Sequence, residues 1–214
     1  MPDVYKFEEL GAAPLICGAV YRGGNQGNIS DDPISKLLRV GNQRGFRYFG
    51  RVADGGIKYV VLYSDKKNKD WPDSFNDGER SFTYYGDNKD AGNQLHATPG
   101  NKLLRDVYRS LHTNNRNLIP PFFVFTKSDL GRDVVFKGLA VPGAESLSES
   151  EDLVAEWRTS TQGRFQNYKA VFTMLDYDEV SKKWLTDLEE GKAISPNTPS
   201  AFYAFITSGI YNPW

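Results

Sequence analysis

Short apolar runs separated by polar loops fill the middle of the chain and predict several β-strands. The strongest is residues 57–63 (IKYVVLY), which is rich in β-branched side chains and bounded by glycines and a Ser-Asp pair. Residues 45–52 (GFRYFGRV) alternate apolar or aromatic side chains with basic ones, which indicates a strand with one charged face. The ADGG turn at residues 53–56 suits a hairpin between these two strands. Further strands are predicted at residues 81–85, 120–125, 134–141 and 168–176.

The helical segments lie mostly outside this strand-rich region. In residues 101–111, Leu103, Leu104, Val107 and Leu111 fall on one helical face, and basic side chains occupy the other. Further helices are predicted at residues 150–159, 180–190 and 201–209.

Strands followed by long polar loops, with helices around them, favour an α+β fold. The two longest loops cover residues 64–80 and 86–100. We expect a curled or barrel-like β-sheet with peripheral helices. With 214 residues and no internal linker, the chain is predicted to form a single domain over residues 1–214, with its core at about residues 20–190.

Composition excludes several classes of protein. One cysteine, Cys17, cannot form an internal disulfide framework, and two histidines, His96 and His112, leave little for a zinc centre or an HNH nuclease. No stretch reaches 18 apolar residues, and the N-terminus lacks the basic and apolar regions of a signal peptide. We therefore expect a cytoplasmic protein with no membrane segment, no metal and no cofactor.

The net charge is only −1, yet the charges are unevenly spread. Residues 36–58 carry six basic and one acidic side chain, and residues 102–116 carry four and one. Residues 144–190 carry eleven acidic and five basic side chains. This distribution predicts either two solvated faces of opposite sign or a polyanion bound by the first half of the chain.

The stretch with candidate chemistry is residues 57–90. A polar loop contains Trp71 and Asp73, and the next strand brings Tyr84. Two facing aromatic rings form a slot for a flat group, and an ionised carboxylate at its rim accepts a hydrogen bond from an amino group such as that of cytosine. Such a slot suits a base taken out of its duplex, because stacking helps to offset the cost of extrusion. From the residues alone, the alternative is that Trp71 covers a small apolar cluster and Tyr84 lies in the core.

At these residues the chain resembles a known family. A strand, an acidic loop with an aromatic residue and then FTYxG is similar to the SRA (SET and RING-associated) fold, which binds methylated cytosine. More of the chain resembles the N-terminal recognition domain of AspBHI-type restriction endonucleases, in the MspJI group of modification-dependent enzymes, a domain also found fused to HNH nucleases. The matching motifs run from about Val20 to the C-terminus: VYRGGNQGN, VGNQRGFRYFGR, VVLYS, DWPD, FTYYGDN, NKLLRDVY, PPFFVF, GLAVPG and RFQNYKAVFTMLD.

The resemblance implies residues for a modified-base pocket. Trp71 and Tyr84 would stack on the flipped base, and Asp73 would read its cytosine edge. Tyr85 and Asp87 stand where other SRA domains often carry small residues, so Asp87 competes with Asp73 as the base reader.

Further residues are candidates for contacts to the duplex. The turn after Tyr85 offers Gly86, Asn88 and Lys89 to a phosphate, and two Gly-flanked loops suit the grooves. The first loop carries Asn42, Gln43, Arg44 and Arg47, and the second carries Asn25, Gln26 and Asn28. On the predicted helix, Arg105 and Arg109 reach backbone phosphates or stay in water. For each of these, the alternative is an ordinary solvated surface position, and Cys17 is expected to be a buried small apolar residue.

The implied function is that of a DNA-binding module that flips and reads 5-methyl- or 5-hydroxymethylcytosine in double-stranded DNA. A PD-(D/E)xK nuclease motif is not convincing, since residues 189–192 (EEGK) have no upstream strand aspartate in register. We expect no catalysis by this chain and a nuclease domain in cis or in trans. The alternatives are a reader of another DNA modification on the same fold, and a metal-dependent nuclease or hydrolase using Asp73, Asp87 and His96.

Overall fold

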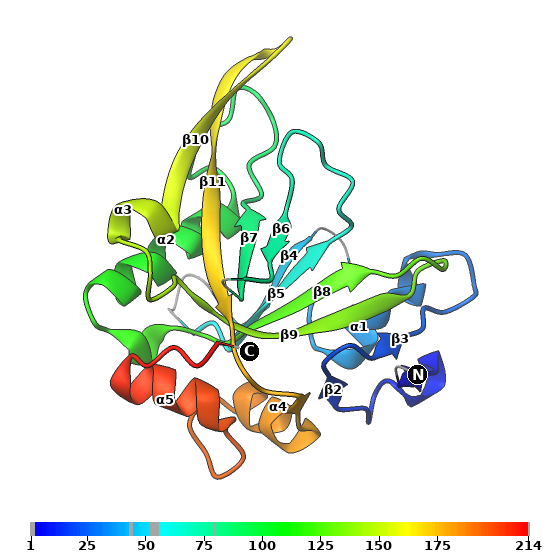
Figure 1. The fold of residues 1–214 in the computed structure, drawn as a ribbon. Coiled ribbons are helices and arrows are strands. Elements are labelled where there is room, and N and C mark those ends of the chain that lie inside the picture. Colours follow the sequence, from blue (N-terminus) through cyan, green and yellow to red (C-terminus); the bar gives the residue numbers. More distant parts are fainter. Residues whose placement is uncertain (1–2, 43–44, 52–55, 79, 214) are drawn as a thin grey trace.

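The computed structural model describes residues 3–42, 45–51, 56–78 and 80–213. One large mixed β-sheet runs through them, with helices packed around it (Figure 1). The strands are β1 (Val4–Tyr5), β2 (Leu15–Ile16), β3 (Val20–Tyr21), β4 (Phe46–Phe49), β5 (Tyr59–Ser64), β6 (Ser74–Asn76), β7 (Ser81–Tyr85), β8 (Phe122–Lys127), β9 (Val134–Pro142), β10 (Leu153–Ser160), β11 (Gly163–Met174) and β12 (Glu179–Val180). The helices are α1 (Pro33–Leu37), α2 (Pro99–His112), α3 (Glu149–Asp152), α4 (Lys182–Glu189) and α5 (Ser200–Ser208).

The main sheet follows the order β4-β5-β8-β9-β11-β7-β6. β5 and β8 are parallel, and the other neighbours in this order pair antiparallel. Off this order, β3 pairs with both β9 and β1, and β10 pairs with β11. β12 and β2 form a small separate sheet. Among the described residues β4 and β6 do not pair with each other, so the expected barrel-like sheet is open rather than closed.

The two central strands explain why the core forms here. β5 and β8 are almost entirely buried, as expected for parallel strands covered on both faces. Trp184 of α4 packs its ring against Phe123 of β8 and Phe202 of α5. On α2, Tyr108 packs against Phe172 of β11. These aromatic contacts fix the helices against the sheet.

Several predicted elements are confirmed, and two predictions are wrong. Helices form where helical spacing predicted them in α2, α4 and α5. The helix expected at residues 150–159 is instead the four-residue α3 followed by β10, because residues 153–160 pair residue by residue with β11. β6 lies inside the segment that was expected to be a loop, and the ADGG turn at residues 53–56 lies partly outside the described residues.

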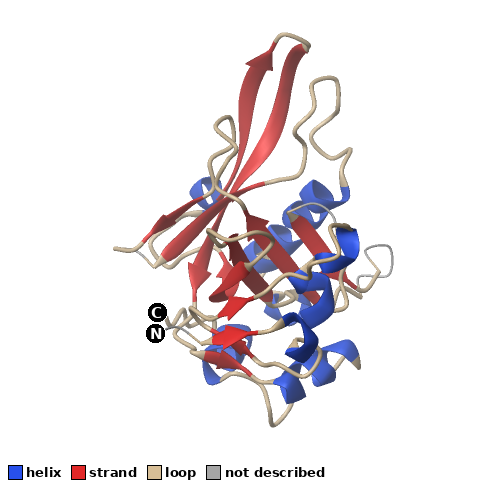
Figure 2. Ribbon diagram, turned by 90° about the vertical axis from the view of Figure 1, so that its right-hand side faces the viewer, coloured by secondary structure: helices blue, strands red, loops and turns tan. Residues whose placement is uncertain are grey.

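A long hairpin is the most prominent feature of the outline. β10 and β11 run past the end of β7 and project from the body of the molecule (Figures 1 and 2). Only the part of β11 from Lys169 onward pairs with β7. The earlier part of the strand, which begins at Gly163, extends beyond β7 into the projecting hairpin. We call residues 153–169 the arm. None of the helices in the described ranges is long and apolar enough to cross a membrane.

Candidate functional site

Asp73 and Tyr84 meet at the hairpin of β6 and β7. In this ladder Ser74 pairs with Thr83, so Asp73 comes opposite Tyr84 and on the same face of the sheet. The backbone N–H of Tyr85 donates to Asp73 Oδ1 at 2.9 Å and holds the carboxylate beside the strand. The structure therefore brings together two of the residues expected in the pocket.

The environment of Asp73 makes its ionisation harder than usual. Burial raises the pKa of the Asp73 carboxyl, and the hydrogen bonds from Tyr85 N–H and the Ser64 hydroxyl, with the charge of Lys89, partly oppose this. Burial also raises the pKa of the Tyr84 phenol, and the carboxylates of Asp73 and Asp87 add to the shift. Tyr84 thus stays neutral.

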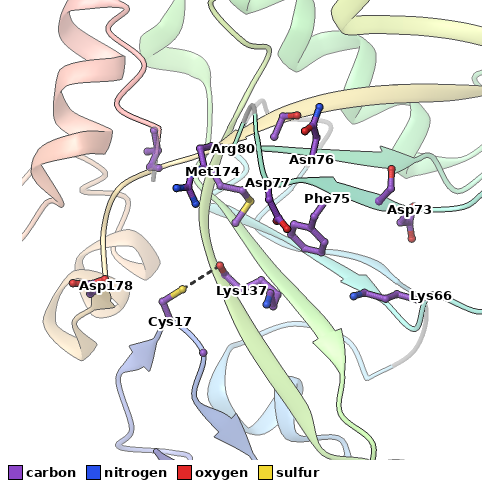
Figure 3. Close-up of a pocket in the computed structure, with 14 residues that line it drawn as sticks. Cys17, Lys66, Asp73, Phe75, Asn76, Asp77, Arg80, Lys137, Met174 and Asp178 are labelled. Atoms are coloured by element: carbon purple, nitrogen blue, oxygen red, sulfur yellow. Dashed lines mark hydrogen bonds between the residues drawn. The ribbon is translucent and has the colours of Figure 1, made fainter. Parts of the chain in front are cut away.

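A cavity of about 530 Å³ opens beside Asp73 (Figure 3). Phe75 of β6 is one of the residues that line it, and the ammonium groups of Lys66 and Lys137 lie 5.5 and 5.6 Å from the centroid of the Phe75 ring. Cys17 and Met174 add sulfur-bearing, largely apolar surface, and the Cys17 thiol donates to the Lys137 carbonyl at 3.3 Å. The cavity combines an aromatic ring with three acids and three cations, which suits a flat polar group that carries both hydrogen-bond donors and a charged part. The acids are Asp73, Asp77 and Asp178, and the cations are Lys66, Arg80 and Lys137.

The expected slot between Trp71 and Tyr84 is not formed in this structure. Trp71 is 2% exposed and packs against Tyr85 at 5.3 Å and Phe165 at 5.9 Å between ring centroids. Tyr84 packs instead against Phe46 and Phe82 in the main core. Because neighbouring residues of a strand point to opposite faces, Trp71 lies on the face of Tyr85 and away from Tyr84. The alternative derived from the residues alone, a tryptophan over a small apolar cluster, describes this geometry.

Asp87 is committed to the start of α2. Its carboxylate accepts hydrogen bonds from the Thr98 hydroxyl, from Gly100 N–H at 2.9 Å and from Asn101 N–H at 2.9 Å. An aspartate in this position caps the free N–H groups of the helix and is favoured by the helix dipole. The arrangement leaves Asp73 as the better placed of the two candidate base readers.

The turn after Tyr85 is mostly buried rather than open to a phosphate. Gly86 and Asn88 are buried, while Lys89 is exposed. A side chain on Gly86 would collide with Asn101, since a Cβ there would lie 1.9 Å from Asn101 Oδ1. Asn88 donates to the Gln166 carbonyl at 2.8 Å, and Asn167 donates to the Gly86 carbonyl at 2.9 Å. Buried asparagines therefore hold this turn against β11 and α2.

Arg47, expected in the basic loop, lies in strand β4 and serves the fold internally. Arg47 is 7% exposed and forms two charge-assisted hydrogen bonds to the Asp32 carboxylate, at 2.7 and 3.1 Å. Asn42 is half-buried and donates to the Ile29 carbonyl at 3.2 Å. Gln43 and Arg44, also expected to contact DNA, lie outside the described residues.

The remaining candidates are at the surface. In the second loop Asn25, Gln26 and Asn28 are exposed, and Asn28 caps a short 3-10 helix through Ser30 N–H at 2.8 Å. On α2, Arg105 donates to Asp106 at 2.8 Å, and Arg109 lies 3.8 Å from the same carboxylate. Contacts of these side chains to DNA stay a prediction.

The residues of the alternative metal-dependent enzyme do not come together. His96 Nε2 hydrogen-bonds the Tyr168 hydroxyl at 2.8 Å, Asp87 caps α2, and Asp73 faces the β6–β7 hairpin. Within the described ranges no group of three or more His, Cys, Asp or Glu side chains is arranged to hold a metal ion. The geometry gives no support to a metal site built from these three residues.

Sequence reasoning missed the cavity around Phe75 and the buried polar pairs. The sequence offered one indication of Phe75. It comes two residues after Asp73, and residues two apart in extended chain have their side chains on the same face. No local signal pairs Arg47 with Asp32, because the contact joins strand β4 to the start of helix α1, 15 positions away in the sequence.

Fold and site together define a binding domain: an open α+β sheet that carries an acidic and aromatic cavity and a projecting arm. By comparison with known sequences, the chain belongs to the family described as Restriction endonuclease AspBHI N-terminal, which matches residues 15–214. A search of curated proteins found no match.

Solved structures agree with this family. The DNA recognition domain of the cytosine modification-dependent restriction endonuclease LpnPI is 42% identical, with a TM-score of 0.92 over 100% of this chain and 96% of that one. The DNA modification-dependent restriction endonuclease AspBHI is 40% identical, with a TM-score of 0.91 over 98% of both chains. The MspJI restriction endonuclease in complex with a 27-mer oligonucleotide shares the fold at 17% identity, with a TM-score of 0.63 over 94% of this chain and 54% of that one. The SRA-like fold expected from the motifs is confirmed.

Proposed function

We propose that this chain recognises modified cytosine in double-stranded DNA by taking the base out of the helix. The observation that carries the proposal is membership of the AspBHI N-terminal family, together with likeness over the whole chain to a relative described as a DNA recognition domain. The nuclease that acts on this recognition is a separate domain, in cis or in trans. A restriction system acts on DNA inside the cell, so a cytoplasmic location is part of the proposal.

Asp73 is the proposed reader of the base. Its carboxylate is held by Tyr85 N–H and lies at the wall of the 530 Å³ cavity, whose size is typical of small-ligand sites. A carboxylate that accepts from the exocyclic amino group of cytosine distinguishes it from thymine, which has a carbonyl oxygen at that position. Asp73 therefore supplies selectivity for the base rather than for the backbone.

The rest of the cavity suits the remaining parts of an extruded nucleotide. Lys66, Arg80 and Lys137 supply positive charge for its phosphate beside the acids Asp77 and Asp178. Cys17 and Met174 supply apolar surface for a substituent on the ring. Tyr84 adjoins Asp73 and stays the proposed stacking wall, which requires its ring to be uncovered when the base enters. Trp71 is proposed to support the arm, since it lies on the other face.

Equilibrium binding in EDTA tests the proposal. The measurement compares the dissociation constants of one duplex sequence carrying a single 5-methylcytosine, a 5-hydroxymethylcytosine or an unmodified cytosine. We expect tighter binding to a modified duplex and loss of that preference in Asp73→Ala. Asp129→Ala removes an exposed acid in the β8–β9 turn and serves as the matched control.

Each outcome has a clear meaning. Equal affinity of the wild-type chain for all duplexes would reject the reading of cytosine modification, and preference for a different modified base would favour the alternative reader. Metal-dependent cleavage of the duplex by this chain would favour the enzyme instead. Retained preference in Asp73→Ala would reject Asp73 as the reader.

A further inference from the structure

The arm has two faces with different surroundings. Because side chains alternate along its strands, Glu156, Arg158 and Phe165 share one face, which we call the inner face. Trp157, Arg164, Gln166 and Tyr168 share the other, which we call the outer face. Trp157 pairs with Gln166 across the ladder, and Arg164 is the diagonal neighbour of Trp157.

The inner face is held by the body of the protein. Phe165 packs on Trp71, and the Arg158 guanidinium lies 5.0 Å from the centroid of the Trp71 ring. The Tyr85 hydroxyl donates to Glu156 at 3.4 Å. A two-stranded hairpin is marginal on its own in water, so these contacts are what keep the arm in place.

The outer face has no such cover near the tip. Trp157 is 52% exposed, which is unusual for so large an apolar side chain. The Arg164 guanidinium stacks 4.3 Å from the Trp157 ring centroid, and Arg164 forms no ion pair with any residue in the described part of the chain. The exposed indole and the arginine stacked on it therefore leave one π face and one positive charge available to another molecule.

Positive charge continues from the arm to α2. At the base of the outer face, the Tyr168 hydroxyl and His96 Nε2 share a hydrogen bond. The pKa of His96 is lowered first by burial and then by the nearby Arg105, Asp106 opposes this shift, and Arg109 and Lys102 lower the pKa further. Of the three basic side chains in the arm, Arg164 lies on this outer face, whereas Arg158 and Lys169 lie on the inner face. Arg164 on the outer face and Arg105, Arg109 and Lys102 on α2 thus form a basic strip, in which Asp106 is the acid paired with Arg105 and Arg109.

We propose that the outer face of the arm is a second contact surface for duplex DNA, which binds the backbone away from the modified base. The inference rests on the proposed function. Charge complementarity selects the occupant, since a basic strip fits a polyphosphate backbone, and Arg164 supplies the phosphate contact while Trp157 packs against the groove wall. The six residues by which β11 extends beyond Lys169 span about 20 Å, enough to reach about six base pairs from the base of the arm.

The test is the affinity of the 214-residue chain for a methylated and an unmodified duplex, measured over about 50 to 200 mM salt. Arg164→Ala should weaken binding to both duplexes by the same factor, about fivefold near 0.15 M salt, and should reduce the salt slope by about 0.9, because one counterion fewer is released. Arg164→Lys keeps the charge and should keep the slope. Trp157→Ala should weaken binding to both duplexes with less change in slope.

Lys183→Ala is the control, since it removes one exposed charge on α4, at the end of the molecule away from the arm (Figure 1). Unchanged affinity and slope in Arg164→Ala would overturn the proposal, and so would a loss confined to the modified duplex, which would place Arg164 at the base. The two proposals fail separately. Absence of modification preference in the wild-type chain rejects the proposed function, whereas the arm is judged by the loss of affinity common to both duplexes.

Discussion

At the scale of single residues, buried charged side chains in this protein are compensated in two different ways. Arg47 is neutralised by a two-point pair with Asp32, with side chains only 6% and 13% exposed. Asp73 forms no such ion pair with any of the described residues, and a backbone N–H holds it beside a cavity. A buried carboxylate that is not ion-paired is costly to keep, and its raised pKa records that cost. The paired charges of Arg47 and Asp32 therefore stabilise the fold, whereas the charge of Asp73 is available to a ligand.

The raised pKa of Asp73 predicts a pH dependence of modification preference. Burial moves the pKa of this carboxyl above its ordinary value, so its ionised form is lost at a higher pH than for a typical aspartate. We expect the ratio of affinities for methylated and unmodified duplexes to fall as pH is lowered from about 7 to about 5. Asp73→Asn cannot titrate, and its ratio should not change over this range. A ratio in the wild-type chain that is independent of pH would contradict a reader that must be ionised.

The pair of Arg47 and Asp32 predicts a large effect on stability. Arg47→Ala leaves the buried Asp32 carboxylate without its partner and should lower the free energy of unfolding by about 3 kcal/mol or more. The matched control is Arg39→Ala, whose pair with Glu189 has an arginine that is 68% exposed and should contribute about 0.5 kcal/mol. Urea unfolding of both variants measures the difference. Similar small losses would show that Arg47 does not act through a buried pair.

At the scale of elements, the hairpin of β6 and β7 organises both faces of the site. Its inward side chains, Phe75, Phe82 and Tyr84, join the cavity and the core, while Tyr85 points the other way and meets Trp71. β11 pairs with β7 and continues into the arm, so the same strand connects the proposed base reader with the outer face. A change at Trp71 should therefore act on the arm before it acts on the cavity.

Trp71→Ala should destabilise the protein by about 3 kcal/mol through loss of a buried aromatic side chain. Amide hydrogen exchange gives the location of the effect: protection should fall most in β10 and in the outer part of β11. Trp157→Ala is the control, because the exposed indole should change unfolding by no more than about 0.5 kcal/mol. Loss of protection around β5 and β8 without loss in the arm would contradict the bracing role.

Gly86→Ala tests the buried turn between β7 and α2. A Cβ at Gly86 would lie 1.9 Å from Asn101 Oδ1 and 2.7 Å from Asn167 Oδ1, so both amides must move. We expect a loss of about 2 kcal/mol or more in the free energy of unfolding. Gly11→Ala meets no atom within 4 Å and should be nearly neutral. A neutral Gly86→Ala would show that the turn adapts easily, as an open phosphate-binding turn would.

Local patterns predicted the elements better than they predicted the site. The periodicity of α2 and the β-branched run of β5 are visible in the sequence because burial on one face or on both leaves a repeat. β10 was missed because its conformation comes from pairing with β11, not from its own residues. The place of Trp71 depends on which face of β7 it meets, and loop residues carry no periodicity to settle that. The motifs pointed to Asp73 and Tyr84 together, and the β6–β7 register places them side by side.

At the scale of the whole molecule, charge and shape divide the surface. Acidic side chains are most frequent in residues 144–190, yet the arm within this segment carries net positive charge. The basic strip on α2 and the outer face starts from the strands that bear the cavity, so one duplex can engage both. In DNA recognition, contacts to the phosphate backbone usually position the protein, and contacts to bases supply the specificity. The account therefore requires that DNA be bound on the arm side and that one base leave the stack.

Fluorescence of 2-aminopurine placed next to the target cytosine measures that last step most directly. Stacking quenches this base, and extrusion of its neighbour unstacks it. We predict that saturating the 5-methylcytosine duplex with the chain raises the fluorescence, that the unmodified duplex gives a smaller rise at equal saturation, and that Asp73→Ala removes the difference. Saturated binding of the methylated duplex with no change in fluorescence would contradict base flipping.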